Sequence, residues 1–99
     1  MVTKYELKEQ LDAAEVAIKR KIIIMNTYDM LHSFKNDAMR SQLIRMAENK
    51  SMPTTDLFYG LSYLRLNGHV GMKLVEKTDK GEIEMCYWLN SKHDDGGKV

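Results

Sequence analysis

The feature that most constrains the fold of this 99-residue chain is a change in the spacing of its apolar residues at Gly68. Before Gly68, apolar side chains recur every three or four residues, which is the spacing of one face of an α-helix. After it they recur at every second residue, in 70–75 and again in 82–89, as in strands with one face on a core. The turn-forming residues 78–81 separate these two runs. The sequence therefore predicts an α+β fold in which helices precede a C-terminal β-hairpin.

A long amphipathic helix is predicted for the N-terminal part of the chain. The segment from Tyr5 to Met25 contains neither Gly nor Pro, and it has one apolar stripe with helical spacing. This stripe packs either on the chain's own domain or, like a heptad seam, against a second copy. We expect a homodimer, because a chain this short gains stability from a partner. The expected interface residues are Leu7, Leu11, Ala14, Ile18 and Ile22.

Residues 26–67 are predicted to hold further helices. Asn26-Thr27 is either a short break or a polar point in one continuous helix, and we favour a separate segment that ends near Phe34. Asp37 or Ser41 is expected to cap the next helix with its side chain. Ser and Thr caps, Pro53 and Asp56 then predict the start of a helix that ends at Asn67-Gly68.

The chain is accordingly divided into three parts. Residues 1–26 form the N-terminal helix, residues 27–90 form the compact domain, and residues 91–99 form a tail that is expected to be disordered.

The order of helices and hairpin, together with residues 47–70, resembles the winged helix-turn-helix superfamily. In that superfamily a small residue of the second helix, here Ala47, lets the recognition helix approach. Three apolar residues anchor this helix, and they correspond here to Leu57, Leu61 and Leu64. The motif L-x-x-x-G-x-I/V then leads into the wing, and it is present from Leu64 to Val70. The resemblance implies three helices plus a C-terminal β-hairpin wing, here with a long additional helix before them.

The resemblance also implies a function, which is sequence-specific binding of double-stranded DNA by a small transcriptional regulator. The recognition helix would enter the major groove and the wing would contact the backbone. The expected DNA contacts are Thr54, Thr55, Tyr59, Ser62, Tyr63 and Arg65 of the recognition helix, Arg40 and Arg45 of the preceding helix, and Lys77 and Lys80 of the wing. The alternative for the tyrosines is packing against the N-terminal helix, and for the arginines it is an ordinary surface position.

The charge of the chain favours a different function. The formal net charge is only +1, so any affinity for DNA must come from the local placement of a few cations. The alternative is a winged helix that binds a protein, as an adaptor, accessory factor or inhibitor, through Tyr59, Tyr63 and Leu66. A purely structural dimer module is a third possibility.

The sequence offers no candidate for catalysis, for a metal or for a cofactor. Cys86 is the only cysteine, the three histidines are far apart, and no Gly-rich phosphate loop or nucleophile-base pattern is present. We therefore expect a protein that is not an enzyme. The charged start lacks the apolar run of a signal peptide, and Ile22–Met25 is too short to span a bilayer, so we expect a cytoplasmic protein without membrane contact.

Overall fold

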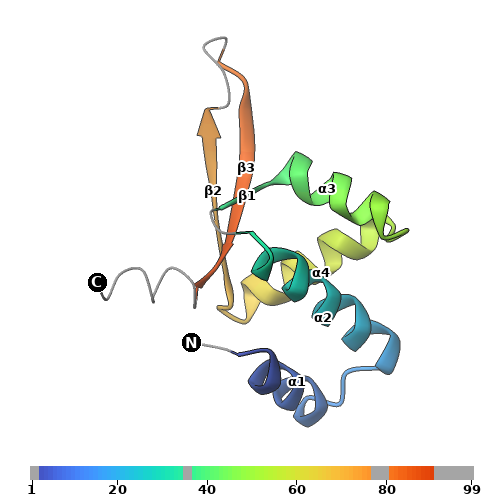
Figure 1. Ribbon diagram of the computed structural model, residues 1–99. Coiled ribbons are helices and arrows are strands. Elements are labelled where there is room, and N and C mark those ends of the chain that lie inside the picture. Colours follow the sequence, from blue (N-terminus) through green and yellow to red (C-terminus); the bar gives the residue numbers. More distant parts are fainter. Residues whose placement is uncertain (1–2, 35–36, 77–80, 91–99) are drawn as a thin grey trace.

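The computed structural model describes residues 3–34, 37–76 and 81–90, and helices α2 to α4 lie on one side of a small antiparallel sheet (Figure 1). The elements are α1 (Lys4–Ala13), α2 (Ile18–His32), β1 (Ala38–Met39), α3 (Arg40–Asn49), α4 (Thr54–Leu66), β2 (Val70–Glu76) and β3 (Ile83–Leu89). The strand order is β1-β3-β2. This arrangement is consistent with a winged helix, in which α3 and α4 form the helix-turn-helix and β2 and β3 form the wing. The predicted fold class is confirmed.

The single long N-terminal helix is wrong, because the structure has two helices in this region. α1 ends at Ala13, and Glu15 has a φ of 54°, which is left-handed backbone. The backbone N–H of Val16 donates to the Leu11 carbonyl at 3.2 Å, a bond that closes the end of α1 as in a Schellman motif. The chain therefore reverses direction although no glycine marks the turn.

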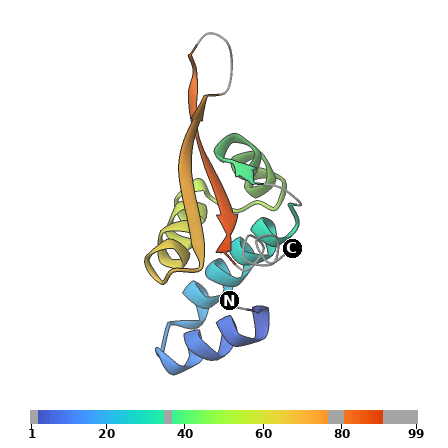
Figure 2. The ribbon, with the colours of Figure 1, turned by 90° about the vertical axis from the view of Figure 1, so that its left-hand side faces the viewer.

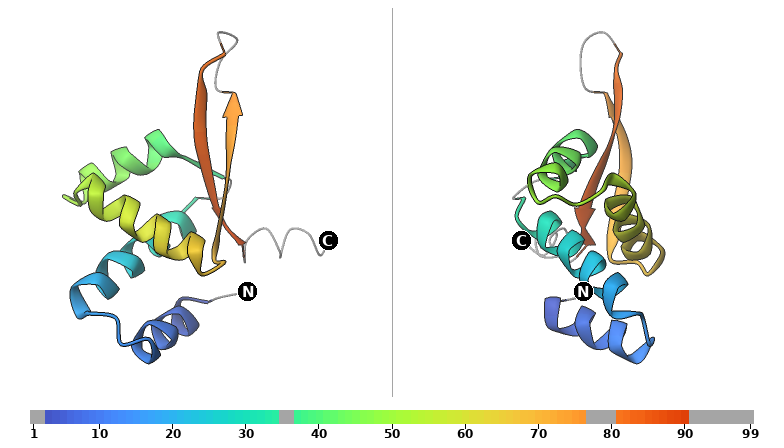
Figure 3. Two further views of the ribbon diagram at one scale, coloured as in Figure 1. Left: turned by 180° about the vertical axis from the view of Figure 1, so that it is seen from behind. Right: turned by 90° about the vertical axis from the view of Figure 1, so that its right-hand side faces the viewer.

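α1 folds back along α2 as an antiparallel helical pair (Figure 3). Two ion pairs join these helices at opposite ends, Asp12–Lys21 at 2.7 Å and Lys4–Asp29 at 3.0 Å. Gln10 Oε1 also lies 2.8 Å from His69 Nε2, so α1 contacts the chain just before β2. The N-terminal helix is thus part of the same packed unit as the winged helix.

α2 continues without interruption past Asn26-Thr27, so the separate second segment that we favoured is not present. The division between residues 26 and 27 falls inside this helix. Thr27 is fully buried, and its Oγ1 donates to the Ile23 carbonyl at 2.8 Å. The polar side chain is satisfied within its own helix, which explains how it is tolerated on a buried face.

α2 and α4 cross in close contact at Thr27 and Gly60. A Cβ on Gly60 would overlap Thr27 Oγ1 and would lie 2.8 Å from Thr27 Cβ. Glycine is therefore required here for the two helices to approach this closely. The crossing belongs to one hydrophobic core, whose buried members are Leu7, Leu11, Ile24, Tyr28, Met30, Leu31, Ala38, Leu43, Ala47, Leu57, Leu61, Leu64, Val70, Tyr87 and Leu89. The three predicted anchors of α4 are all in this core.

Residues 50–53 connect α3 to α4 and complete the helix-turn-helix. Ser51 has a φ of 57°, the left-handed conformation for which glycine is usually chosen. The backbone N–H of Met52 donates to the Ala47 carbonyl at 2.8 Å, which satisfies one of the last carbonyls of α3. The turn is therefore well ordered by hydrogen bonds in spite of lacking glycine.

The wing extends past the helices, so only its base belongs to the core (Figures 1 and 2). Val70 and Leu89, which are paired at the base, are buried. Leu74 and Ile83, further along the same face, are each 65% exposed. The predicted alternation identifies both strands, but only the start of β2 and the end of β3 have a core to face.

We predict that Gly60→Ala lowers the free energy of unfolding by about 1–3 kcal/mol, the usual range for overpacking a core. An exposed helical position would behave in the opposite way, because alanine is about 1 kcal/mol better than glycine in a helix. Urea unfolding gives the sign directly. Adding Thr27→Ala removes Oγ1 and the methyl group from the crossing, so we expect the double variant to lose less stability than the two single losses combined. A Gly60→Ala variant that is more stable than wild type would contradict the close crossing.

Candidate functional site

The outer face of α4 is the surface that a recognition helix would present to DNA. Thr54, Thr55, Ser62 and Arg65 are exposed on this helix, as the prediction requires. Leu66 is also exposed, at 78%. The face therefore offers hydroxyl groups and one guanidinium, next to one large apolar side chain.

Tyr59 and Tyr63 are half-buried at the edge of this face. Their ring centroids are 6.5 Å apart, and the guanidinium of Arg20 lies 5.5 Å from the Tyr59 ring centroid. Arg20 belongs to α2, so one of these rings packs against a neighbouring helix. Their remaining exposed surface is available to a partner.

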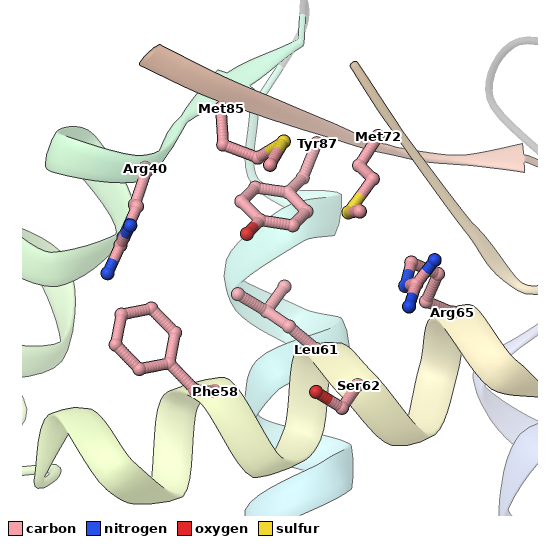
Figure 4. A pocket seen from close by; sticks show the side chains of 8 residues that line it. All are labelled: Arg40, Phe58, Leu61, Ser62, Arg65, Met72, Met85 and Tyr87. Carbon is pink, nitrogen blue, oxygen red and sulfur yellow. The ribbon is translucent and has the colours of Figure 1, made fainter. Parts of the chain in front are cut away.

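A pocket of about 270 Å³ lies between α4, the start of α3 and the wing (Figure 4). Its apolar lining consists of Phe58, Leu61, Met72 and Met85, and its polar lining consists of Arg40, Ser62, Arg65 and Tyr87. The side chains come from α3, α4, β2 and β3, so the pocket exists only when wing and helices are packed together.

Tyr87 brings a hydroxyl group into this pocket. The residue is only 9% exposed, and in Figure 4 its hydroxyl points into the space between α4 and Arg40. Within the described residues this hydroxyl has no hydrogen-bond partner, although it is not sealed from solvent. Burial raises the pKa of the phenol, while the charges of Arg40 and Arg65 act in the opposite direction. The net shift is upward, so the phenol is protonated at neutral pH and is a ready hydrogen-bond donor.

Arg40 and Arg65 place two positive charges around the same pocket (Figure 4). The guanidinium of Arg40 lies 4.7 Å from the ring centroid of Phe58, which is a cation–π contact. None of the ion pairs among residues 3–34, 37–76 and 81–90 involves either arginine. Their charge is therefore available to an anion from outside the chain.

The position of Arg40 depends on Glu84 of β3. The carboxylate of Glu84 accepts hydrogen bonds from the backbone N–H of Ser41 at 3.2 Å and from its hydroxyl at 3.1 Å. These bonds hold the first turn of α3, which contains Arg40, against the wing. A carboxylate at the positive end of a helix is also favourable electrostatically.

The expected side-chain cap from Asp37 or Ser41 is wrong. Met39 occupies the N-cap position, and its backbone N–H donates to Gln42 Oε1 at 2.9 Å. The hydroxyl of Ser41 itself donates to Glu84, which lies far away in the sequence. The residues around the start of α3 do not indicate that a distant residue of β3 will accept its hydrogen bonds.

Other predicted contacts lie elsewhere. Arg45 is exposed on α3 and does not line the pocket. Lys77 and Lys80, like the tail 91–99, lie outside the described residues.

Four residues that line the pocket were not predicted as site residues, namely Phe58, Met72, Met85 and Tyr87. Their helical and strand spacing indicates core positions, and nothing in the sequence shows where the core stops.

The predicted dimer stripe is divided by the turn after α1. Leu7 and Leu11 are fully buried in the chain's own core, so they are not available to a partner in this fold. Ala14 is exposed at the end of α1. Ile18 and Ile22, one turn apart on α2, are 73% and 55% exposed and line a second pocket of about 310 Å³ between α1 and α2.

Comparison of the chain with models of known protein families, with curated proteins and with solved structures finds no match. Within the part of the chain that the structure describes, no helix combines the length and apolar character needed to cross a bilayer. The same residues contain no cluster of three or more His, Cys, Asp or Glu side chains arranged for a metal ion.

We predict that Glu84→Ala lowers the free energy of unfolding by about 1 kcal/mol, as expected for the loss of a helix cap. Thermal or urea unfolding measures this loss. Glu82→Ala is the matched control, because Glu82 is exposed on the same hairpin and has no described hydrogen bond to α3. Equal stability of the two variants would show that Glu84 does not fix the start of α3.

Proposed function

We propose that the protein is a small transcriptional regulator that binds double-stranded DNA, with α4 in the major groove and the wing on the flanking backbone. The observation that carries this proposal is that Arg40, Arg65 and the Tyr87 hydroxyl line one pocket beside the exposed face of α4, with the two arginines on opposite sides of it (Figure 4). In this mode the recognition helix enters the major groove, so the residues beside it lie near the DNA backbone. Arg40 and the neutral Tyr87 donor suit contact with a phosphate group, while Arg65 lies on the exposed face of α4 that would meet the bases.

The low net charge makes this local arrangement decisive. Each phosphate neutralised by Arg or Lys releases condensed counterions, so a few well-placed cations supply most of the affinity for any sequence. Ser62 and Thr55, exposed on α4, are suited to phosphate or base contacts. Arg65, also on α4, is the one residue of this helix suited to bidentate reading of guanine.

A second candidate function is protein binding, and it is favoured by the exposed apolar side chains near the same surface. Leu66 on α4 and Leu74 on the wing are both largely exposed. Tyr59 and Tyr63 add half-buried aromatic rings, which are frequent anchors in protein interfaces. A partner of this kind would use the aromatic edge of α4 more than the arginine pocket.

We also propose that the protein forms a homodimer through the groove between α1 and α2. Ile18, Ile22 and Met25 line one groove, and its rim carries both signs of charge, such as Lys4 and Asp12. A two-fold axis brings the same surface of each copy together, so a surface with both signs is compatible with itself. Duplication of α4 by a dimer would suit two half-sites of DNA one helical turn apart.

The DNA proposal predicts a specific pattern of variant effects. Arg40→Ala should weaken binding to every duplex sequence and reduce the slope of log K against log salt by about one, because one phosphate contact is lost. Arg65→Ala should cost about 1–3 kcal/mol on the preferred site if it reads a base. Fluorescence anisotropy of labelled duplexes at two salt concentrations measures both effects.

Lys19→Ala is the control for simple loss of charge, because Lys19 is exposed on α2 and lines neither the arginine pocket nor the groove between α1 and α2. It should leave duplex binding nearly unchanged. A wild-type protein that binds no duplex even at ~50 mM salt, where phosphate contacts are strong, would refute DNA binding and favour the protein partner.

The dimer proposal predicts that replacing Ile18 and Ile22 together by serine produces a monomer without unfolding the chain, because both side chains are exposed. Light scattering and sedimentation measure the mass. Leu66→Ser removes an equally exposed apolar side chain from α4, and this control should remain dimeric. Wild-type protein that is monomeric at about 50 µM would exclude a dimer with a low-micromolar Kd.

A further inference from the structure

We propose that the pocket between α4 and the wing binds a small organic anion, such as a carboxylate or phosphate ester attached to a single ring or a short apolar group. The pocket combines two features that a site for bare phosphate does not need. Arg40, Arg65 and the Tyr87 hydroxyl supply charge and a hydrogen-bond donor, and Phe58 with two methionines supplies an apolar wall.

The Tyr87 hydroxyl is a donor that a ligand in this pocket can reach (Figure 4). It is carried by a residue that is nine-tenths buried, and it has no partner within the described residues. Burial raises the pKa of this phenol, so at neutral pH it donates a hydrogen bond but carries no charge. It shares the pocket with Arg40 and Arg65, whose positive charges favour an anion there.

The apolar part of the pocket points to an organic body on the anion. Met72 and Met85 reach the pocket from β2 and β3, while Leu61 and Phe58 reach it from α4 (Figure 4). Thioether side chains adapt their shape to a ring and make favourable contacts with its edge. The volume of about 270 Å³ is just below the usual range for drug-sized ligands, so it suits a compound with one ring.

Occupation of this pocket has a regulatory consequence, which rests on the proposed DNA binding. The ligand would engage the same two arginines that we propose for DNA contacts. The two ligands would therefore compete, and the small anion would release the protein from DNA. The existence of the pocket site itself does not depend on DNA binding.

The test uses phenyl phosphate as the probe and the methyl groups of ¹³C-labelled methionines as the NMR signals. We expect saturable shifts at Met72 and Met85, which line the pocket, with a Kd of about 1 mM or below. Met30, in the core, should not respond. Inorganic phosphate and benzyl alcohol carry only the charge or only the ring, and each should bind at least about tenfold more weakly, since one set of contacts is missing.

The variants Tyr87→Phe and Arg65→Ala test the donors separately. Tyr87→Phe keeps the ring in the core and removes only the hydroxyl, so the fold should be retained, as an unchanged Met30 signal would show. We expect at least about tenfold weaker binding in both variants, the usual effect of losing a hydrogen bond to a charged group. Arg45→Ala, an exposed arginine outside the pocket, is the control and should bind normally.

Three results would overturn the inference: no saturable shift at Met72 and Met85, phenyl phosphate no tighter than inorganic phosphate, or unchanged affinity in both variants. Displacement of a labelled duplex by phenyl phosphate is measured separately. Probe binding by a protein that binds no duplex would refute the proposed function but support the pocket, and duplex binding without probe binding would do the reverse.

Discussion

The close contact of Thr27 with Gly60 sets the position of α4, and the rest of the fold depends on it. Because no side chain separates the helices at this point, Leu57, Leu61 and Leu64 can all reach the core. The end of α4 then determines where the wing begins: the backbone N–H of His69 donates to the Leu64 carbonyl at 2.8 Å, and Gly68 has a φ of 79°. One small residue in the middle of a helix thus controls the placement of the hairpin beside it.

Much of the fold was predictable from hydrophobic spacing, because both strands and the helix-turn-helix have regular patterns. The turn after α1 was not, since the apolar stripe keeps its helical spacing straight across it. A left-handed glutamate, Glu15, ends the helix where the sequence contains no Gly or Pro. What ends α1 is the gain from packing Leu7 and Leu11 against the chain's own core, a tertiary effect that local propensity does not report. The same effect leaves Ile18 and Ile22 as the exposed remainder of the stripe.

The candidate site was only partly predictable, for a related reason. Arg40, Ser62 and Arg65 follow from the helical pattern and the resemblance to winged helices. Tyr87 and Met85 have strand spacing that indicates core positions, and the sequence does not reveal that the core ends partway along the wing. Their role comes from the register of β2 and β3, which sets Met72 opposite Tyr87 and Leu74 opposite Met85. The spacing of apolar residues sorts positions only into buried and exposed. It is therefore least informative for residues at the border between the core and solvent.

The bond from Glu84 to the first turn of α3 means that the wing is not an independent arm. A force that bends the hairpin is transmitted through this carboxylate to Ser41, and so to the arginine beside it. We therefore expect β3 and the start of α3 to move together. A partner that closes on both surfaces meets groups already held in mutual register, and little conformational freedom remains to be lost when it binds. This coupling also limits the choice of partner. A partner whose contacts to the wing and to α3 are spaced differently can fit only if the partner itself changes shape.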